Sequence, residues 1–212
     1  MISTSPRPQR LIIGISGASG AIYGVRLLEL LRDTPIETHL VVSKSALITL
    51  SHETGLSWSQ LKPMATVCYS NQDIGAAIAS GSFKTMGMVV APCSVRSMSE
   101  IASGVTSTLL TRAADVVLKE RRRLVLMVRE TPLHRNHLRT MTELAELGAI
   151  IAPPVPAFYS KPASLAEMVD HTLGRVLDMF DIEFGIVRRW RDDPETVPTL
   201  DEIDSSLATE RG

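Results

Sequence analysis

The fold of this chain is decided by one stretch, Leu11-Ile12-Ile13-Gly14-Ile15-Ser16-Gly17-Ala18-Ser19-Gly20, which is followed by a Leu-rich run to Leu31. Apolar residues that end in Ser and Gly, and then give way to helical spacing, predict a buried strand, a tight turn and a helix. Glycine lets a ligand approach the backbone closely, and the first N–H groups of a helix have no partner within it. The turn therefore predicts a phosphate site, to which Ser16 and Ser19 add hydroxyl donors.

The glycine positions in this turn are, in order, Gly14, Gly17 and Gly20. Their spacing differs from the G-x-G-x-x-G pattern of dinucleotide-binding proteins. A dinucleotide fold would also place an acidic residue after the next strand, to hold the ribose, whereas residues 37–42 are followed by Ser43 and Lys44. A hydroxyl and a cation suit a second phosphate contact, so the sequence favours a mononucleotide such as FMN over NAD.

Length and composition are those of an ordinary globular protein. The 212 residues suffice for one sizeable core, 44% of them are hydrophobic, and the formal net charge is −1. This balance does not indicate nucleic acid or an anionic membrane surface as a partner. Two cysteines are too few for a disulfide framework, so we expect a reducing cytoplasm. Residues 1–10 lack the apolar core of a signal peptide, and no apolar run approaches the length of a membrane span.

The chain is expected to form a single domain. Residues 1–10 are polar and contain two prolines, which predicts a flexible N-terminal segment. Residues 11–190 form the expected flavin-binding α/β domain. Residues 191–212 are acidic and contain further prolines, which predicts a C-terminal tail outside the domain.

Strand and helix patterns alternate along the domain. Continuous apolar runs predict further strands over 86–91, 124–128 and 149–152, and a short one over 66–69. Helical spacing is found over 46–56, 73–80, 109–119, 136–147 and 164–180. The expected fold class is therefore α/β: a doubly wound parallel sheet of the Rossmann-like flavoprotein type, in three α/β/α layers.

In such a sheet the ligand binds beyond the carboxyl ends of the strands. The segments expected at those ends are 16–20, Ser43-Lys44, Cys93-Ser94, Arg129-Glu130 and the proline-rich segment after Ala152. They bring hydroxyls, cations and a carboxylate to one edge of the sheet.

Several motifs occur in a fixed order along the chain: Ser16-Gly17-Ala18-Ser19-Gly20, Ala91-Pro92-Cys93-Ser94, Arg112-Ala113-Ala114-Asp115, Lys119-Glu120-Arg121-Arg122, Arg129-Glu130-Thr131-Pro132 and Pro154-Val155-Pro156-Ala157-Phe158-Tyr159. With these motifs the chain resembles the UbiX family of flavin prenyltransferases, including the subfamily that accompanies phenolic-acid decarboxylases. The resemblance covers about residues 11–180, and together the motifs are far more specific than the glycine turn alone.

The resemblance implies both a reaction and an assembly. The family transfers a dimethylallyl group from dimethylallyl phosphate to N5 and C6 of reduced FMN. Its product, prenylated FMN, is the cofactor of UbiD-type decarboxylases, which would be the partners that receive it. The family forms homo-dodecamers whose active sites lie between subunits, so we expect the same assembly here.

The resemblance also assigns site residues. It implies that FMN is bound by Gly17, Ala18, Ser19, Ser43, Arg129 and the turn made of Ser94, Val95, Arg96 and Ser97. It implies that the prenyl phosphate is held by Arg112, Lys119, Tyr159 and Arg175. The catalytic residues it implies are Ser19, Glu53, Lys119 and Glu130, and it implies no metal.

These residue types suit the implied chemistry. An allylic phosphate leaves as an anion while positive charge develops on carbon, so cationic donors such as Lys119 and Arg175 stabilise the leaving group. After the bond to C6 forms, that carbon must lose a proton. Glu130 is expected to relay it, with the released phosphate as a candidate base.

Three positions depart from the family pattern. Thr108 stands where the family usually has Asn, and Val128 stands where it usually has Pro. The turn after Cys93-Ser94 continues as Val95-Arg96-Ser97, where the family often has smaller residues or Met-Lys. Arg96 therefore bears on FMN affinity rather than on the type of reaction.

Simpler structural roles compete with the assigned ones. Arg129 and Glu130 can form an ion pair at a strand end, and Arg175 can pair with Asp178 on its own helix. Lys119 and the arginines of 121–123 can be a solvated helix end. Tyr159 can anchor the proline-rich loop, and Cys93 is expected to be a small buried residue rather than a nucleophile.

Two other functions remain open on the sequence alone. Flavin-dependent cysteine decarboxylases share the expected fold and use a histidine on an early helix as a base. His52 lies directly before Glu53, so this enzyme class is the nearest competitor. A non-catalytic flavin carrier would keep the FMN turn but would not need Lys119 and Arg175.

Overall fold

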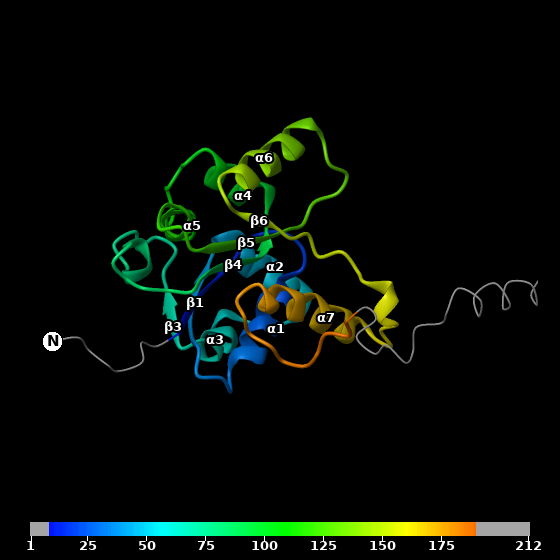
Figure 1. Ribbon diagram of the computed structural model, residues 1–212. Coiled ribbons are helices and arrows are strands. Elements are labelled where there is room, and N and C mark those ends of the chain that lie inside the picture. The colour runs from blue at the N-terminus through cyan, green and yellow to red at the C-terminus, as the bar shows by residue number, and fades with distance from the viewer. Residues whose placement is uncertain (1–8, 190–212) are drawn as a thin grey trace, which may run out of the picture.

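The structure is a computed structural model that describes residues 9–189. Six parallel strands form one sheet in the order β3-β2-β1-β4-β5-β6 (Figure 1). The strands are β1 (Arg10–Ile15), β2 (Glu37–Val42), β3 (Val67–Tyr69), β4 (Gly87–Cys93), β5 (Arg123–Val128) and β6 (Ile150–Ile151). The chain winds outward from β1 through β2 to β3, then returns beside β1 as β4 and winds the other way. The doubly wound parallel sheet predicted from the sequence is confirmed.

Helices cover both faces of this sheet. They are α1 (Ala21–Leu31), α2 (Lys44–Thr54), α3 (Trp58–Leu61), α4 (Val95–Ala102), α5 (Leu109–Lys119), α6 (Arg135–Glu146) and α7 (Leu165–Asp178), with short 3-10 turns η1 (Lys62–Met64), η2 (Ala77–Ala79) and η3 (Phe158–Ser160). One face carries α1, α2, α3 and α7, and the other carries α4, α5 and α6 (Figure 1). The expected three-layer α/β/α architecture is therefore confirmed.

Successive side chains of β1 point to opposite faces of the sheet, so they belong to two separate parts of the core. Leu11, Ile13 and Ile15 pack with α1, α2 and α7, whereas Ile12 packs with α4 and α5. All of these side chains are at most 1% exposed. Because both faces of the strand are covered, the sequence is continuously apolar there instead of alternating.

Gly24 allows α1 to lie close to the sheet. A Cβ on Gly24 would fall 2.6 Å from the carbonyl oxygen of Ala91 on β4 and 2.6 Å from Ile15 Cδ1. The absence of a side chain there places the start of α1 directly over the ends of β1 and β4.

Most predicted elements are found within a few residues of their expected bounds. The helix expected over 73–80 is wrong: only η2 forms, and the rest is turns. The side chain of Asp73 accepts a hydrogen bond from the Gly75 N–H over 3.3 Å, which favours a turn over a helix start. The segment expected as a turn over Ser94–Ser97 is instead the N-cap and first residues of α4, because Ser94 caps that helix.

The first strand begins close to its expected start. β1 begins at Arg10, one residue before the predicted start, and Arg10 forms an ion pair with Glu37 over 2.7 Å. The expected tail over 191–212 and most of the N-terminal segment lie outside the described residues. Within 9–189, no helix combines the length and apolar character needed to cross a membrane.

Candidate functional site

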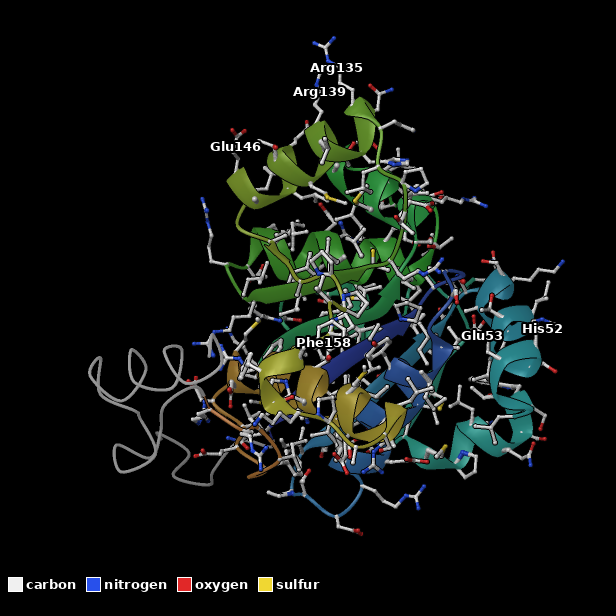
Figure 2. The ribbon with its side chains drawn as sticks, turned by 90° about the vertical axis from the view of Figure 1, so that its right-hand side faces the viewer. His52, Glu53, Arg135, Arg139, Glu146 and Phe158 are labelled. Atoms are coloured by element: carbon white, nitrogen blue, oxygen red, sulfur yellow. The ribbon has the colours of Figure 1, made fainter. Side chains whose placement is uncertain are left out.

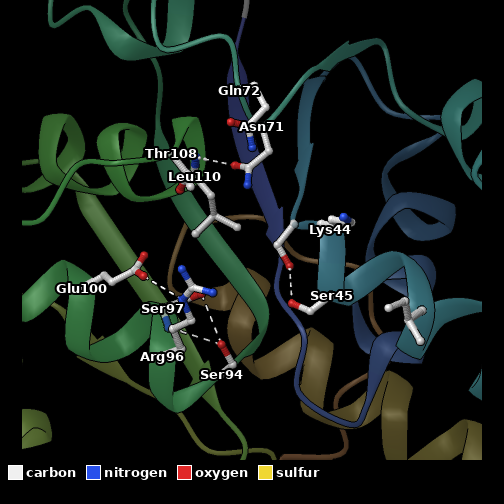
Figure 3. A pocket seen from close by; sticks show the side chains of 12 residues that line it. Lys44, Ser45, Asn71, Gln72, Ser94, Arg96, Ser97, Glu100, Thr108 and Leu110 are labelled. Carbon is white, nitrogen blue, oxygen red and sulfur yellow. Dashed lines mark hydrogen bonds and ion pairs between the residues drawn. The ribbon is translucent and has the colours of Figure 1, made fainter.

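A cavity of about 340 Å³ opens at the carboxyl edge of the sheet (Figure 3). It lies where the winding direction reverses between β1 and β4, which is the position at which α/β sheets bind ligands. Its walls come from the starts of α2 and α4, the segment after β3, and the start of α5. The lining residues are Ser43, Lys44, Ser45, Ile48, Asn71, Gln72, Ser94, Arg96, Ser97, Glu100, Thr108 and Leu110.

Two helices begin at this cavity with serine caps. The Ser43 hydroxyl accepts the Ala46 N–H over 3.1 Å, and the Ser94 hydroxyl accepts the Ser97 N–H over 3.3 Å. Each cap also contacts a second hydroxyl, since Ser43 Oγ lies 3.1 Å from Ser45 Oγ and Ser94 Oγ lies 3.2 Å from Ser97 Oγ. Two positive helix ends and four hydroxyls thus face one space, which suits a phosphate and a polyol.

Gly17 packs directly against the start of α2. A Cβ on Gly17 would fall 2.2 Å from Ser45 Oγ and 2.5 Å from Ser45 Cβ. Only glycine permits this contact between the turn after β1 and the hydroxyls of the cavity. Ala18, which follows it, is 9% exposed.

Ser16 has a structural role rather than the ligand-donor role expected from the sequence. Its hydroxyl donates to the Pro92 carbonyl over 2.9 Å and accepts the Ser94 N–H over 2.7 Å. Ser16 is 1% exposed. The side chain therefore joins the ends of β1 and β4, because those two strands are neighbours in the sheet.

Glu53 binds the start of α1. Its Oε2 accepts the N–H groups of Gly20 over 2.8 Å and Ala21 over 2.9 Å. The first N–H groups of α1, expected to face a phosphate, are therefore partly occupied by a carboxylate from α2. Partial burial alone would raise the pKa of Glu53, but hydrogen bonds from Ser19 and these two N–H groups, with the nearby charge of Arg129, hold it below its ordinary value.

Arg129 and Glu130 follow β5 at the same edge. The Arg129 N–H donates to the Cys93 carbonyl over 3.1 Å, which fixes the strand end beside β4. Glu130 accepts the N–H of Thr131 over 2.9 Å. Among the ion pairs of residues 9–189, none joins Arg129 to Glu130, so the competing structural ion pair is not formed. Ser19 and Arg129 both act on the Glu53 carboxylate, as described above, so the structure brings these three residues together.

Arg96 lines the cavity from the first turn of α4. Its guanidinium donates to Glu100 over 2.8 Å, and the side chain is 82% exposed (Figure 3). Lys44 lies across from it on α2. Val95, also assigned to the flavin, packs as a partly buried residue against the core below α4. The cavity therefore has two cations on its rim, one of which is paired with a carboxylate.

Several cavity residues, chiefly Asn71 and Gln72, were not predicted from the sequence. Asn71 holds the start of α5, since its carbonyl accepts the Leu109 N–H over 2.9 Å and its Oδ1 accepts the Leu110 N–H over 3.0 Å. These residues follow the short strand β3, which was predicted over 66–69, so the end of that strand was the signal that could have placed them at the cavity. Thr108, noted as a departure from the family, caps α5 through its hydroxyl.

Lys119 lies far from this cavity within one chain. It is the last residue of α5, whose Leu110 lines the cavity, and nine residues of helix span roughly 14 Å. Lys119 pairs with Glu120 beside Gly81. Arg112, on the same helix, pairs with Asp115 over 2.7 Å. The helix therefore carries Lys119 away from the carboxyl edge of the sheet.

Neither Arg175 nor Tyr159 lines the cavity. Arg175 pairs with Asp178 over 2.7 Å near the end of α7, as the simpler interpretation expected. That end of α7 is joined to the start of β5, because Asp181 pairs with Arg123 over 2.7 Å. The Tyr159 ring lies edge-on to His171, with 5.6 Å between ring centroids. A single chain does not bring the four expected phosphate-binding residues together with Ser19.

His52 and Cys93 differ in accessibility. His52 is exposed on α2 beside Glu53 (Figure 2). Cys93 is 0% exposed, and burial raises the pKa of its thiol to about 12. The expectation that Cys93 is a small buried residue is confirmed. In the described part of the chain, no group of three or more His, Cys, Asp or Glu side chains could hold a metal ion.

The geometry fits a flavin mononucleotide. The hydroxyls and helix starts at Ser43 and Ser94 suit its phosphate and ribityl chain, and Ile48 and Leu110 offer apolar contacts. A cavity of this size lies within the usual range of roughly 300–1,000 Å³ for small-molecule sites.

Comparisons with known proteins agree with this assignment. Residues 2–191 match the model of the family described as Flavoprotein. The flavin prenyltransferase UbiX of Escherichia coli strain K12 is 59% identical over 186 residues, which cover 86% of this chain and 98% of the relative.

Two solved structures have the same fold. AnUbiX, solved in complex with FMN and dimethylallyl pyrophosphate, aligns with a TM-score of 0.86 and 45% identity, over 88% of this chain and all of that one. A dodecameric FMN-dependent UbiX-like decarboxylase from Escherichia coli O157:H7 aligns with a TM-score of 0.84 and 46% identity, over 86% of this chain and 100% of that one.

Proposed function

This chain belongs to the UbiX-like flavin prenyltransferases, and from that membership we propose that it joins a dimethylallyl group to N5 and C6 of reduced FMN. The flavin is both bound molecule and substrate, and the donor is dimethylallyl phosphate or its diphosphate. The observation that carries the proposal is the cavity between the starts of α2 and α4, in a chain that is 45% identical to a structure holding FMN and a dimethylallyl donor.

The flavin half of the site comes from one chain. The phosphate of FMN is held by the hydroxyls of Ser43 and Ser45 at the start of α2, with Lys44 at the rim. Ser94, Arg96 and Ser97 on α4 contact the flavin from the opposite wall. Gly17, Ala18 and Ser19 close the third side, and Arg129 approaches from the end of β5. Close packing of Gly17 on Ser45 supports this arrangement.

The donor half comes from neighbouring copies. Lys119 and Arg175 lie at the far ends of α5 and α7, where they cannot reach their own cavity. Tyr159 belongs to the segment after β6 and is 42% exposed. A dodecameric relative supports an assembly in which these residues, with Arg112, approach the flavin cavity of another subunit. The site is then complete only in the oligomer.

The reaction breaks the allylic C–O bond, and the electron pair leaves with the phosphate. N5 of reduced FMN takes the place of the phosphate on the allylic carbon and loses its proton. The prenyl double bond then takes up a proton, and C6 attacks the resulting tertiary cation, which closes the second bond before C6 loses its own proton. Lys119, Arg112, Arg175 and the Tyr159 hydroxyl stabilise the leaving phosphate as its negative charge increases. No metal is needed for this step, because cationic side chains hold the anion.

Two carboxylates serve the proton transfers. Glu130 accepts the proton that leaves C6 and passes it to the departing phosphate or to solvent. Glu53, kept ionised by its hydrogen bonds, stabilises the developing positive charge on the allylic carbon and orients the Ser19 hydroxyl.

The product would be used by a second enzyme. Prenylated FMN would pass to a decarboxylase of the UbiD type, which uses it as cofactor. A reducing cytoplasm suits this role, because both the reduced flavin and the free cysteines persist there.

The test combines purified protein, FMN and a reductant under anaerobic conditions with dimethylallyl phosphate or the diphosphate. Mass spectrometry of the extracted flavin should show a product heavier by the dimethylallyl group. An unchanged flavin with both donors would overturn the proposal. Release of CO₂ from a peptide with a C-terminal cysteine, without any change of the flavin, would establish the competing decarboxylase instead.

A matched variant tests the acidic residue. Glu130→Gln should bind FMN normally and form prenylated flavin at least about tenfold more slowly, since loss of a general base usually costs a factor of roughly 10² to 10⁴. Glu146→Gln on α6 is the control, because this exposed carboxylate projects from the far end of the molecule (Figure 2). Full activity of Glu130→Gln would remove that residue from the mechanism.

A further inference from the structure

A second cavity, of about 410 Å³, adjoins the flavin cavity. It lies between α2, α3 and the segment after β3. Three residues, Lys44, Asn71 and Gln72, line both cavities, so the two spaces share a wall. The shared wall is at the start of α2, which is where the proposed function places the phosphate of FMN. A group attached to that phosphate would therefore extend toward the second cavity.

The second cavity is cationic. Lys44 and Lys62 line it, and neither Asp nor Glu does. Among the ion pairs of residues 9–189, none involves either lysine, so no carboxylate within 4.0 Å neutralises them. Two positive charges in a concave space with no counter-charge favour an anionic ligand, and a phosphate bound between them would neutralise both.

The same cavity has an aromatic wall. Trp58 lies one helical turn before Lys62, so the two side chains share a face of the chain from α3 into η1. The Trp58 residue is 36% exposed, and Leu47 and Val42 add apolar surface. A flat heterocycle stacks favourably on an indole ring, and stacking does not demand a particular base.

The polar groups opposite this wall are suited to a ribose and base edges. Ser70, Asn71 and Gln72 follow one another after β3. The Oδ1 atom of Asn71 is used by the Leu110 N–H, which leaves its NH₂ group as the donor available to a ligand. Together the lining offers cations for a phosphate, an aromatic face for a base and amides for hydroxyl groups.

We infer that this second cavity binds the adenylate half of FAD, so that the chain holds FAD as well as FMN at its flavin site. The pyrophosphate would cross the shared wall at Lys44, and the adenylate would lie between Trp58 and Lys62. The isoalloxazine ring would keep the position that it has in FMN. This inference rests on the proposed placement of the flavin phosphate beside Ser43, and it concerns binding rather than the prenyl transfer.

The test measures flavin affinity on full-length protein freed of flavin. FMN, FAD and riboflavin are titrated separately, with flavin fluorescence as the readout. FAD is expected to bind within about tenfold of FMN. Lys62→Met and Trp58→Leu should each weaken FAD about fivefold or more while leaving FMN within about twofold. Lys84→Met, at an exposed lysine that lines neither cavity, is the matched control and should change neither affinity.

Every other result would contradict either the inference about FAD or the proposed function. FAD binding more than about a hundredfold weaker than FMN refutes the inference and leaves the proposed function intact. Equal weakening of FMN and FAD by Lys62→Met also refutes it, because Lys62 would then act on the shared phosphate. AMP that binds FMN-loaded protein while FAD does not bind indicates a separate nucleotide site, against the inference. Failure of every flavin to bind overturns the proposed function itself.

Discussion

The carboxylate of Glu53 accepts the backbone N–H of Gly20 over 2.8 Å, across 33 residues of sequence. Gly20 has a φ of 101°, a conformation that glycine adopts without strain, and it directly precedes α1. The start of α1 is therefore capped by a side chain from another helix. This contact joins the glycine turn to α2, two of the elements that form the proposed flavin site.

Replacing Glu53 with Gln should destabilise the fold by about 1 kcal/mol at neutral pH, since an exposed charge at a helix start contributes about that much. The folded state holds the pKa of Glu53 below its unfolded value, so the stabilisation is complete above the unfolded pKa of about 4.3 and is lost as the pH falls through the folded pKa. Urea unfolding of both proteins between neutral and acid pH measures the difference.

A second carboxylate variant serves as the control for these unfolding measurements. Glu146→Gln, on the exposed surface of α6, should leave stability unchanged at every pH (Figure 2). A Glu53→Gln protein as stable as the parent at pH 7 would show that the negative charge of Glu53 contributes nothing to folding.

Gly17→Ala should weaken FMN binding and lower stability. Its Cβ would fall 2.2 Å from Ser45 Oγ, so the turn or the start of α2 must move, at a cost of about 1–3 kcal/mol. Adding Ser45→Gly removes the opposing hydroxyl and Cβ, and the double variant should recover most of the lost stability. Thermal melts and FMN titrations of the two single variants and the double variant give the coupling directly.

Gly75→Ala provides the control for this experiment. Its added Cβ would lie at an ordinary 3.6 Å from Asp73 Oδ1 and meet nothing closer. It should bind FMN as the parent does. If Gly17→Ala also behaves like the parent, the contact between the turn and Ser45 is not what shapes the flavin site.

The sequence predicted the sheet well for a physical reason. Strands covered on both faces are continuously apolar, and runs such as 11–15 and 124–128 have the length of a strand rather than of a helix. The helix predicted over 73–80 was wrong because small residues fit a helix by spacing, whereas Asp73 and Gly75 favour local turns. Helix α4 was missed because it is only eight residues long and its capping residue, Ser94, was assigned to a turn.

The order of the elements along the chain predicted only half of the site. Residues that follow parallel strands must meet at one edge, so Ser43, Ser94 and Arg129 were placed correctly at that edge from topology alone. The roles of Lys119, Tyr159 and Arg175 came from resemblance, and one subunit does not bring them to the cavity. No pattern within a single chain specifies which surfaces of an oligomer meet, so this half of the site stays a prediction.

Arg122 differs from the solvated residue that the charge run suggested. Its guanidinium donates to the carbonyls of Gly81 over 2.6 Å and Phe83 over 2.8 Å, and its side chain is 11% exposed. Arg122→Met should cost about 1–3 kcal/mol, because two partly buried carbonyls lose charged donors. Arg122→Lys should recover only part of this loss, since one ammonium cannot reproduce the planar fork. Chemical unfolding measures both changes.

This variant should also affect Lys119. Lys119 and Glu120 pack on Gly81, the residue that Arg122 holds, so loosening the loop should raise the KM for the prenyl donor more than it lowers kcat. Arg139→Met on α6 is the control for loss of a surface arginine (Figure 2). An unchanged unfolding midpoint for Arg122→Met would contradict the assigned role.

Cys93 should be inert toward thiol reagents in the native protein, whereas Cys68 should react slowly. Burial raises the pKa of the Cys93 thiol to about 12, so at pH 8 only about one molecule in 10⁴ carries the reactive thiolate, and the side chain is also 0% exposed. Burial raises the pKa of Cys68 as well, but that residue is only partly buried. Iodoacetamide labelling followed by peptide mass spectrometry should show alkylation of Cys93 only after unfolding in urea. Rapid alkylation of Cys93 in the folded protein would instead mean that the end of β4 opens to solvent, and a thiol would then have to be considered among the groups of the flavin site.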